Sequence, residues 1–142
     1  MHGERTLRHP VLALWVLTLL FALRILAQPL SQIVPVLPGF GAWHGDVLPY
    51  PALLLSQLAI AAAMVVVNLK LARGRLVPRP RLGRGLAMLG TVYFAAMLLR
   101  LVLGQTLYAG SPWLDRPLPT VFHLVLAAWL LLLARYHMRH VR

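Results

Sequence analysis

Apolar residues are gathered into four long runs, which are separated by stretches rich in proline, glycine or basic residues. The runs cover residues 11–28, 51–69, 86–105 and 119–136. Each is close to the length of about 20 residues that an α-helix needs to cross about 30 Å of hydrocarbon. The alternation of apolar and polar residues typical of a membrane β-barrel does not occur. The pattern therefore predicts an all-α integral membrane protein, with residues 1–142 forming one domain, a four-helix up-down-up-down bundle.

Prolines mark the expected ends of these helices. Pro10, Pro51 and Pro119 lie where helices should begin, a position that tolerates proline because its missing N–H has no intrahelical partner there. Pro29 follows the first helix, which leaves residues 29–50 as an outer loop. The second and third helices are then joined by a basic loop over residues 70–85.

Basic residues distinguish the two ends of the predicted bundle. They precede the first helix, fill the loop 70–85 and follow the fourth helix. The other two loops contain a single basic residue between them, Arg116. The basic residues of the loop 70–85 are Lys70, Arg73, Arg75, Arg79, Arg81 and Arg84. Because positively charged loops stay on the cytoplasmic side, both termini and this loop are expected to face the cytoplasm of a bacterial cell. The expected location is the inner (plasma) membrane, as a multi-pass protein.

The composition excludes several classes of function. Hydrophobic residues make up 60% of the 142 residues, and the net charge is +11. The basic residues lie between spanning segments rather than on one face of a soluble fold, so nucleic acid is not an expected partner. Cysteine is absent, which removes thiolate catalysis and cysteine-ligated metals. The histidines match no specific zinc or haem pattern, so neither a metal nor a cofactor is expected.

Two arginines, Arg24 and Arg100, lie inside the predicted spans. The three acidic residues of the chain, Glu4, Asp46 and Asp115, all lie outside the spans. A charge within the bilayer costs about 2.5–3.5 kcal/mol on insertion scales and is normally functional. Guanidinium groups bind phosphate and carboxylate in fork geometry, so the pair predicts a site for an anionic group.

Each helix places one polar residue at the same expected depth, about 6–10 Å below the outer membrane interface at 1.5 Å per residue. The expected ligand-binding residues are Arg24, Gln28, Gln57, Tyr93, Arg100 and His123. The outer loop is apolar, and it is expected to fold back over this layer as a cap. The expected cap residues are Trp43, His44, Asp46 and Tyr50.

Structural roles compete with this interpretation. Either arginine can extend to the outer headgroups, and Arg24 can pair with Asp46 or Arg100 with Asp115. Gln57 and His123 can serve as interhelical hydrogen-bonding groups. His137 and His140, among arginines in the C-terminal tail, are expected to be solvated at the interface.

Three functions follow from the sequence. The first is a membrane protein that binds an anionic lipid or ligand group through the polar layer. The second is a membrane enzyme acting on a lipid-borne substrate, with His123 as the candidate catalytic acid or base. The third is an accessory subunit of a larger complex, in which a membrane-protein partner or a second copy supplies the acidic groups.

Overall fold

The computed structural model describes residues 2–44, 48–111 and 114–139, with side chains from His9 onward. Its α-helices are α1 (His2–Leu30), α2 (Tyr50–Ala72), α3 (Pro80–Gln105) and α4 (Pro117–Arg139), with a short 3-10 helix, η1 (Phe40–Trp43), between α1 and α2. All four α-helices are long and apolar enough to cross a membrane. The prediction of an all-helical chain with four helices of spanning length is therefore confirmed, and these helices indicate a multi-pass membrane protein.

The helix ends differ from the expected ones. Pro10 and Pro29 lie within α1 instead of marking its ends. α3 begins at Pro80 rather than near residue 86, because Pro80 itself serves as the first helical residue. The basic connection between α2 and α3 is consequently shorter than 70–85.

A glycine ends α2 at a defined place. Gly74 adopts a φ of +64°, which favours glycine because a side chain would be crowded there. The N–H of Arg75 donates to the Lys70 carbonyl over 2.8 Å, and the N–H of Gly74 donates to the Leu71 carbonyl over 3.0 Å. These two bonds form a Schellman motif, which satisfies carbonyls at the end of α2 and turns the chain toward α3.

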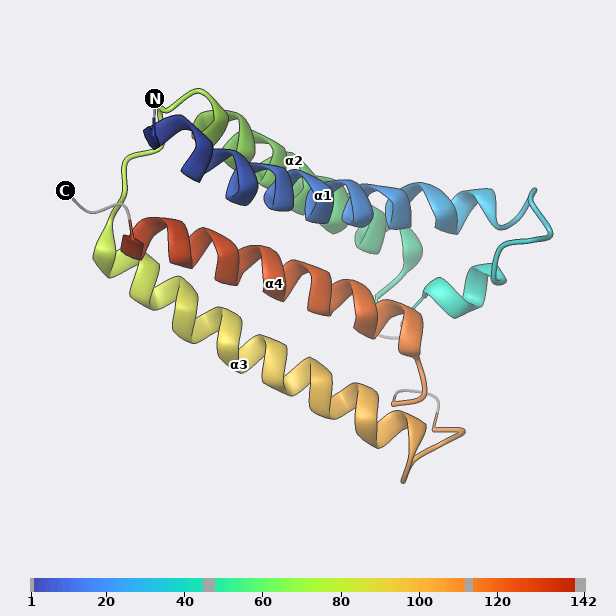
Figure 1. Cartoon of the computed structure of the whole chain (residues 1–142). Coiled ribbons are helices and arrows are strands. Elements are labelled where there is room, and N and C mark those ends of the chain that lie inside the picture. The colour runs from blue at the N-terminus through green and yellow to red at the C-terminus, as the bar shows by residue number, and fades with distance from the viewer. Residues whose placement is uncertain (1, 45–47, 112–113, 140–142) are drawn as a thin grey trace.

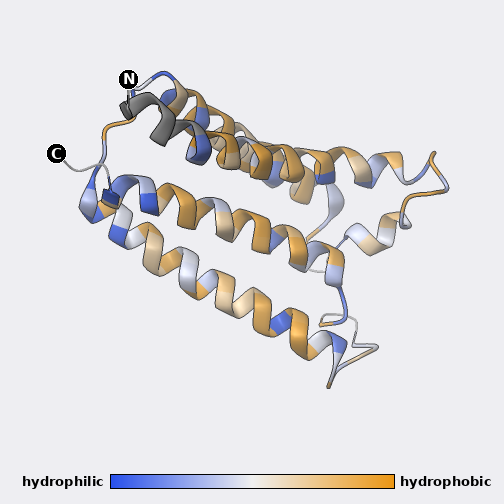
Figure 2. Ribbon diagram, in the orientation of Figure 1, coloured by the Kyte–Doolittle hydropathy of each residue, from blue (hydrophilic) through white to orange (hydrophobic). Residues whose placement is uncertain are grey.

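The helices are arranged around α4. α3 packs along one side of α4 and α1 packs along another, while α2 packs on α1. Figure 1 shows the N-terminus, the α2–α3 connection and the end of α4 at one end of the molecule, with η1 at the other. Hydrophilic segments gather at the end that holds the termini, while most of each helix is apolar (Figure 2).

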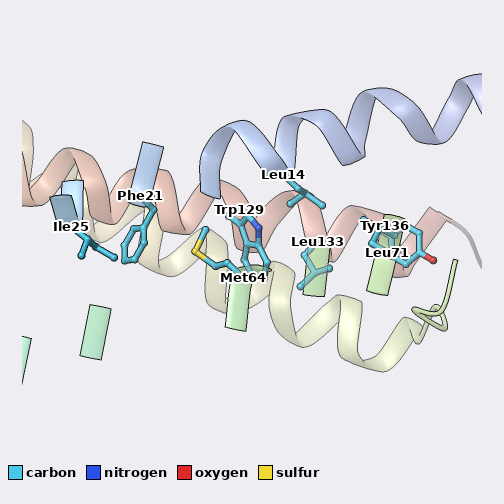
Figure 3. Close-up of a cluster of buried hydrophobic side chains, with 8 residues drawn as sticks. All are labelled: Leu14, Phe21, Ile25, Met64, Leu71, Trp129, Leu133 and Tyr136. Atoms are coloured by element: carbon cyan, nitrogen blue, oxygen red, sulfur yellow. The ribbon is translucent and has the colours of Figure 1, made fainter. Parts of the chain in front are cut away.

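The core follows a seven-residue pattern. Buried residues of α1 recur at alternating spacings of four and three, at Leu14, Thr18, Phe21, Ile25 and Gln28, and Arg24 is buried beside this series. This spacing keeps them on one stripe, as in coiled coils. The stripe meets Met64 and Leu71 of α2 and Trp129, Leu133 and Tyr136 of α4 (Figure 3). The seam is polar at Thr18 and at Gln28, near the η1 end of α1, and apolar between.

Glycines let α3 approach α4 closely. Gly83, Gly90 and Gly104 are buried and lie on one face of α3. A Cβ on Gly90 would lie 3.0 Å from the side chain of Leu131 in α4, and one on Gly104 would lie 2.1 Å from the carbonyl oxygen of Leu114, in the connection that leads into α4. Small residues of this kind allow close helix packing within a membrane. They bring the polar residues of α3 up to those of α4.

Candidate functional site

The register of α1 against α2 sets two glutamines at one level. The amide of Asn68 donates to the Thr18 hydroxyl over 2.8 Å, which fixes the pairing of these helices. Gln57 precedes Asn68 by 68 − 57 = 11 residues, and Gln28 follows Thr18 by 28 − 18 = 10 residues. At 1.5 Å per residue, both lie about 15–17 Å from that bond toward the η1 end of the antiparallel pair.

Arg24 is held at this end of the molecule between a carbonyl and an aromatic ring. One of its terminal nitrogens donates to the carbonyl of Trp43 in η1 over 3.2 Å. Its guanidinium carbon lies 5.6 Å from the ring centre of Phe122, within the range of a cation–π contact. Arg24 is 5% exposed, and its Nε has no hydrogen-bond partner among the described residues. The guanidinium therefore keeps a free donor in a buried position.

Tyr93 of α3 and His123 of α4 form a hydrogen-bonded pair between the Tyr93 hydroxyl and His123 Nδ1. Their rings meet edge to face with centroids 5.9 Å apart. Arg24 and Arg100 both lie close enough to interact electrostatically with Tyr93 and with His123. The structure thus brings two cations from α1 and α3 to one hydrogen-bonded pair.

Gln28 and Gln57 bring unused polar atoms to the same end of the core. Gln28 is 1% exposed, and neither its amide oxygen nor its nitrogen has a hydrogen-bond partner among the described residues. Gln57 is 3% exposed, and its amide nitrogen likewise has no such partner. Leaving a buried polar group unsatisfied costs about 1–3 kcal/mol. Buried groups of this kind call for an explanation, and a bound polar molecule supplies one.

The segment around η1 covers this end of the helices. Arg116 donates to the carbonyls of Gly41 and His44, over 2.6 and 3.2 Å, and so ties η1 to the start of α4. The Trp43 indole N–H donates to the Pro38 carbonyl over 2.8 Å, and its ring lies 6.1 Å from that of Phe122. Trp43 is buried as a result.

The other expected cap residues take different positions. His44 stacks on Phe40 with centroids 6.4 Å apart, and its Nδ1 is buried without a partner among the described residues. Tyr50 is the first residue of α2, and its ring packs edge to face with that of Phe40, with centroids 4.9 Å apart. Asp46 lies outside the described residues.

Asp115 accepts from the Gln105 amide over 3.0 Å and from the Gly110 N–H over 2.7 Å.

A second polar cluster lies midway along the helices. Asn68 donates to the Leu14 carbonyl and the Thr18 hydroxyl, and its amide oxygen accepts from the Trp129 indole over 3.2 Å. Thr18 in turn donates to the Leu14 carbonyl over 2.8 Å. Each of these polar groups is matched, so this cluster joins α1, α2 and α4 structurally and contrasts with the unmatched groups at the η1 end.

His137 corrects one expectation. It is 2% exposed instead of solvated, and its Nδ1 accepts the backbone N–H of Arg79 over 3.1 Å. The cause is α3, whose early start at Pro80 places its first turn against the end of α4. His140 lies outside the described residues.

Sequence reasoning did not single out Phe122, Arg116 or Trp129. Phe122 and Trp129 lie on the same face of α4 as Leu133 and Tyr136. Helical periodicity could therefore have predicted that both face the core. The role of Arg116 depends on a contact with η1 that is distant in sequence. Nothing local in the sequence indicates it.

The arrangement is suited to hold an anionic group rather than a metal ion. Among the described residues, no group of three His, Cys, Asp or Glu side chains could hold a metal. The polar atoms at the η1 end are instead two guanidiniums, two amides, a phenol and an imidazole. Comparisons with protein-family models, curated proteins and solved structures find no match to this chain.

Proposed function

We propose that the chain is a multi-pass protein of the bacterial inner membrane that binds the anionic headgroup of a lipid near the periplasmic face. The orientation rests on charge: the end that carries the termini and the Arg73–Arg79 connection is the basic one, which favours the cytoplasmic side. The helices then run up, down, up and down, with η1 on the periplasmic side.

The buried Arg24 and the unmatched amides are the observation that carries the proposal. Arg24 keeps a free Nε–H, Gln28 and Gln57 keep free amide N–H groups, and Arg100, like Arg24, lies within electrostatic reach of His123. A phosphate offers several acceptor oxygens, so it satisfies these donors and neutralises the two cations together. No acidic residue of the chain lies within the four candidate spans to do so.

Gln57 allows a test in which the stability of the lipid-free protein and the retention of lipid change in opposite directions. Gln57→Leu removes a buried amide nitrogen that has no partner, so the lipid-free protein should be at least as stable as the parent. The same change should weaken lipid retention severalfold. Native mass spectrometry with added phosphatidylglycerol measures retention, and detergent thermal unfolding measures stability. Lower stability with unchanged retention would show that the amide is structural and would refute the proposal.

Replacing Arg24 and Arg100 should weaken lipid binding more than replacing Gln57 does. A hydrogen bond to a charged group is worth about 1.5–3 kcal/mol, so an Arg24→Gln, Arg100→Gln double variant should bind phosphatidylglycerol at this site at least about tenfold more weakly, seen as the loss of one bound lipid from the mass spectrum. Arg84→Gln removes a positive charge from exposed α3 surface outside the site and serves as the control. Equal retention by the double variant and the parent would contradict the proposal.

The Tyr93–His123 pair supports a second candidate, an enzyme acting on a lipid-borne substrate. A hydrogen bond to Nδ1 orients the His123 ring and leaves Nε2 for proton transfer. His123→Ala should then abolish turnover of the bound lipid, followed as loss of intact lipid, while lipid retention persists. Recovery of only unaltered lipid from the parent protein would exclude this candidate.

A further inference from the structure

A groove runs between α1 and α4 in the half of the molecule opposite to η1. It consists of two adjoining hollows of about 360 and 600 Å³. Both are lined by His9 and Ala13 of α1 and by Leu132 of α4. Because the hollows share these walls, they form one continuous groove.

The two parts of the groove differ in chemistry. The smaller hollow, nearer the termini, is lined by Arg135, Tyr136 and Arg139 as well as His9. The larger one is bounded beyond His9 by aliphatic side chains, including Leu17 of α1 and Ala128 of α4. From Arg139 to Ala128 is 139 − 128 = 11 residues. The lining therefore extends about 16 Å along α4, changing from cationic to apolar.

The side chains at the cationic end of the groove can bind a phosphate. Arg135 and Arg139 are four residues apart, so they lie on one face of α4 about 6 Å apart along its axis. Both are exposed, and His9 lies on the opposite wall of the same hollow. Guanidinium groups bind phosphate oxygens in fork geometry. At the basic end of a membrane protein, the phosphate within reach is that of a lipid in the adjacent leaflet.

We infer that this groove binds an anionic glycerophospholipid, with its phosphate between Arg135 and Arg139 and one acyl chain along the aliphatic walls. Charge complementarity selects the headgroup, and the continuous apolar lining accommodates the chain. The site is separate from the one around Arg24, which lies at the other end of α1. Lipid binding in this groove requires only that the helices span a bilayer.

Headgroup selection is tested by comparing two equal losses of charge at the same end of the molecule. The full-length protein is exchanged into phosphatidylglycerol or phosphatidylcholine, and retained lipid is counted by native mass spectrometry. Arg135→Gln, Arg139→Gln should remove one bound phosphatidylglycerol per protein relative to the parent. Arg81→Gln, Arg84→Gln, which removes exposed arginines of α3 outside the groove, should leave the number of bound lipids unchanged. Equal losses in both variants would show attraction by diffuse surface charge and overturn the inference.

The position of the acyl chain is tested with a single cysteine. The chain has no native cysteine, so Ala128→Cys carries the only thiol. Phosphatidylglycerol should slow its alkylation by a maleimide severalfold in detergent, whereas phosphatidylcholine and inorganic phosphate should not. Val92→Cys, at an exposed position of α3, should react at the same rate in all conditions.

Two combined variants separate this site from the one around Arg24. Protection of Ala128→Cys should disappear with Arg135→Gln, Arg139→Gln and persist with Arg24→Gln, Arg100→Gln. Absence of protection by phosphatidylglycerol, or equal protection by phosphatidylcholine, would overturn the inference. Loss of protection in the Arg24 and Arg100 background would also overturn it, because the two sites would then not be separate.

Discussion

Asn68 connects three helices through one side chain, so Asn68→Ala should destabilise the protein strongly. The change removes its bonds to Leu14 and Thr18 of α1 and to Trp129 of α4. Hydrogen bonds between membrane helices contribute about 0.6 kcal/mol on average and up to about 1.7 kcal/mol. The connection to α1 therefore contributes about 1 kcal/mol.

The larger part of the effect comes from the group left behind. Trp129 is buried, and without Asn68 its indole N–H loses the Asn68 amide oxygen as its acceptor, at a cost of about 1–3 kcal/mol. Thr18 keeps its bond to the Leu14 carbonyl and adds nothing. The expected loss in the free energy of unfolding is therefore about 2–4 kcal/mol.

Reversible unfolding in mixed detergent micelles, followed by far-ultraviolet circular dichroism, measures this loss. Ser56→Ala is the matched control, because Ser56 is an exposed polar residue of α2 that bonds within its own helix to the Leu53 carbonyl. It should change stability by less than about 0.5 kcal/mol.

A double-mutant cycle with Trp129→Phe tests whether the unmatched indole N–H causes the larger part of the loss. The double variant lacks both the donor and the acceptor, so its destabilisation should be less than the sum of the two single variants. Strictly additive losses, or an Asn68→Ala variant as stable as Ser56→Ala, would refute the account of the cluster.

Three further changes have definite expected outcomes. Gly104→Ala places a Cβ 2.1 Å from the Leu114 carbonyl oxygen and should lower the free energy of unfolding by at least about 1–3 kcal/mol, measured by the same titration. Gly85→Ala meets nothing within 4 Å on the same helix and should raise it by up to about 1 kcal/mol; a loss would contradict the α3 geometry. Arg116→Ala should increase hydrogen exchange of residues 39–44 severalfold, since two bonds to η1 disappear; unchanged exchange would show that other contacts hold η1.

The helix ends illustrate how far local sequence information reaches. Prolines at the starts of α2 and α3 and Gly74 after α2 are local features, and each marks a helix end in the structure. Pro10 shows the limit, because it lies inside α1 even though the same rule predicted a start there. Neighbouring helices and side chains can compensate for the missing bond of proline within a membrane helix, and the sequence does not reveal that compensation.

The candidate site shows a similar division. The sequence identifies Arg24, Arg100 and the absence of acids in the spans, because cost in the bilayer depends only on residue type and depth. It does not identify Phe122 as the ring beside Arg24, nor the Tyr93–His123 bond. Those depend on which helices touch and on which face each one presents.

The sequence by itself determined four apolar helices of spanning length and which residues are too polar to lie there without a reason. These follow from hydropathy and length, which are sums over local residues. The tertiary structure decided that α4 lies between α1 and α3, that Asn68 is fully matched and that Gln28 and Gln57 are not. Whether a buried polar group finds a partner depends on helix register and crossing, which are set by packing over the whole chain. That is why three similar buried amides in one helical core differ in their hydrogen bonding.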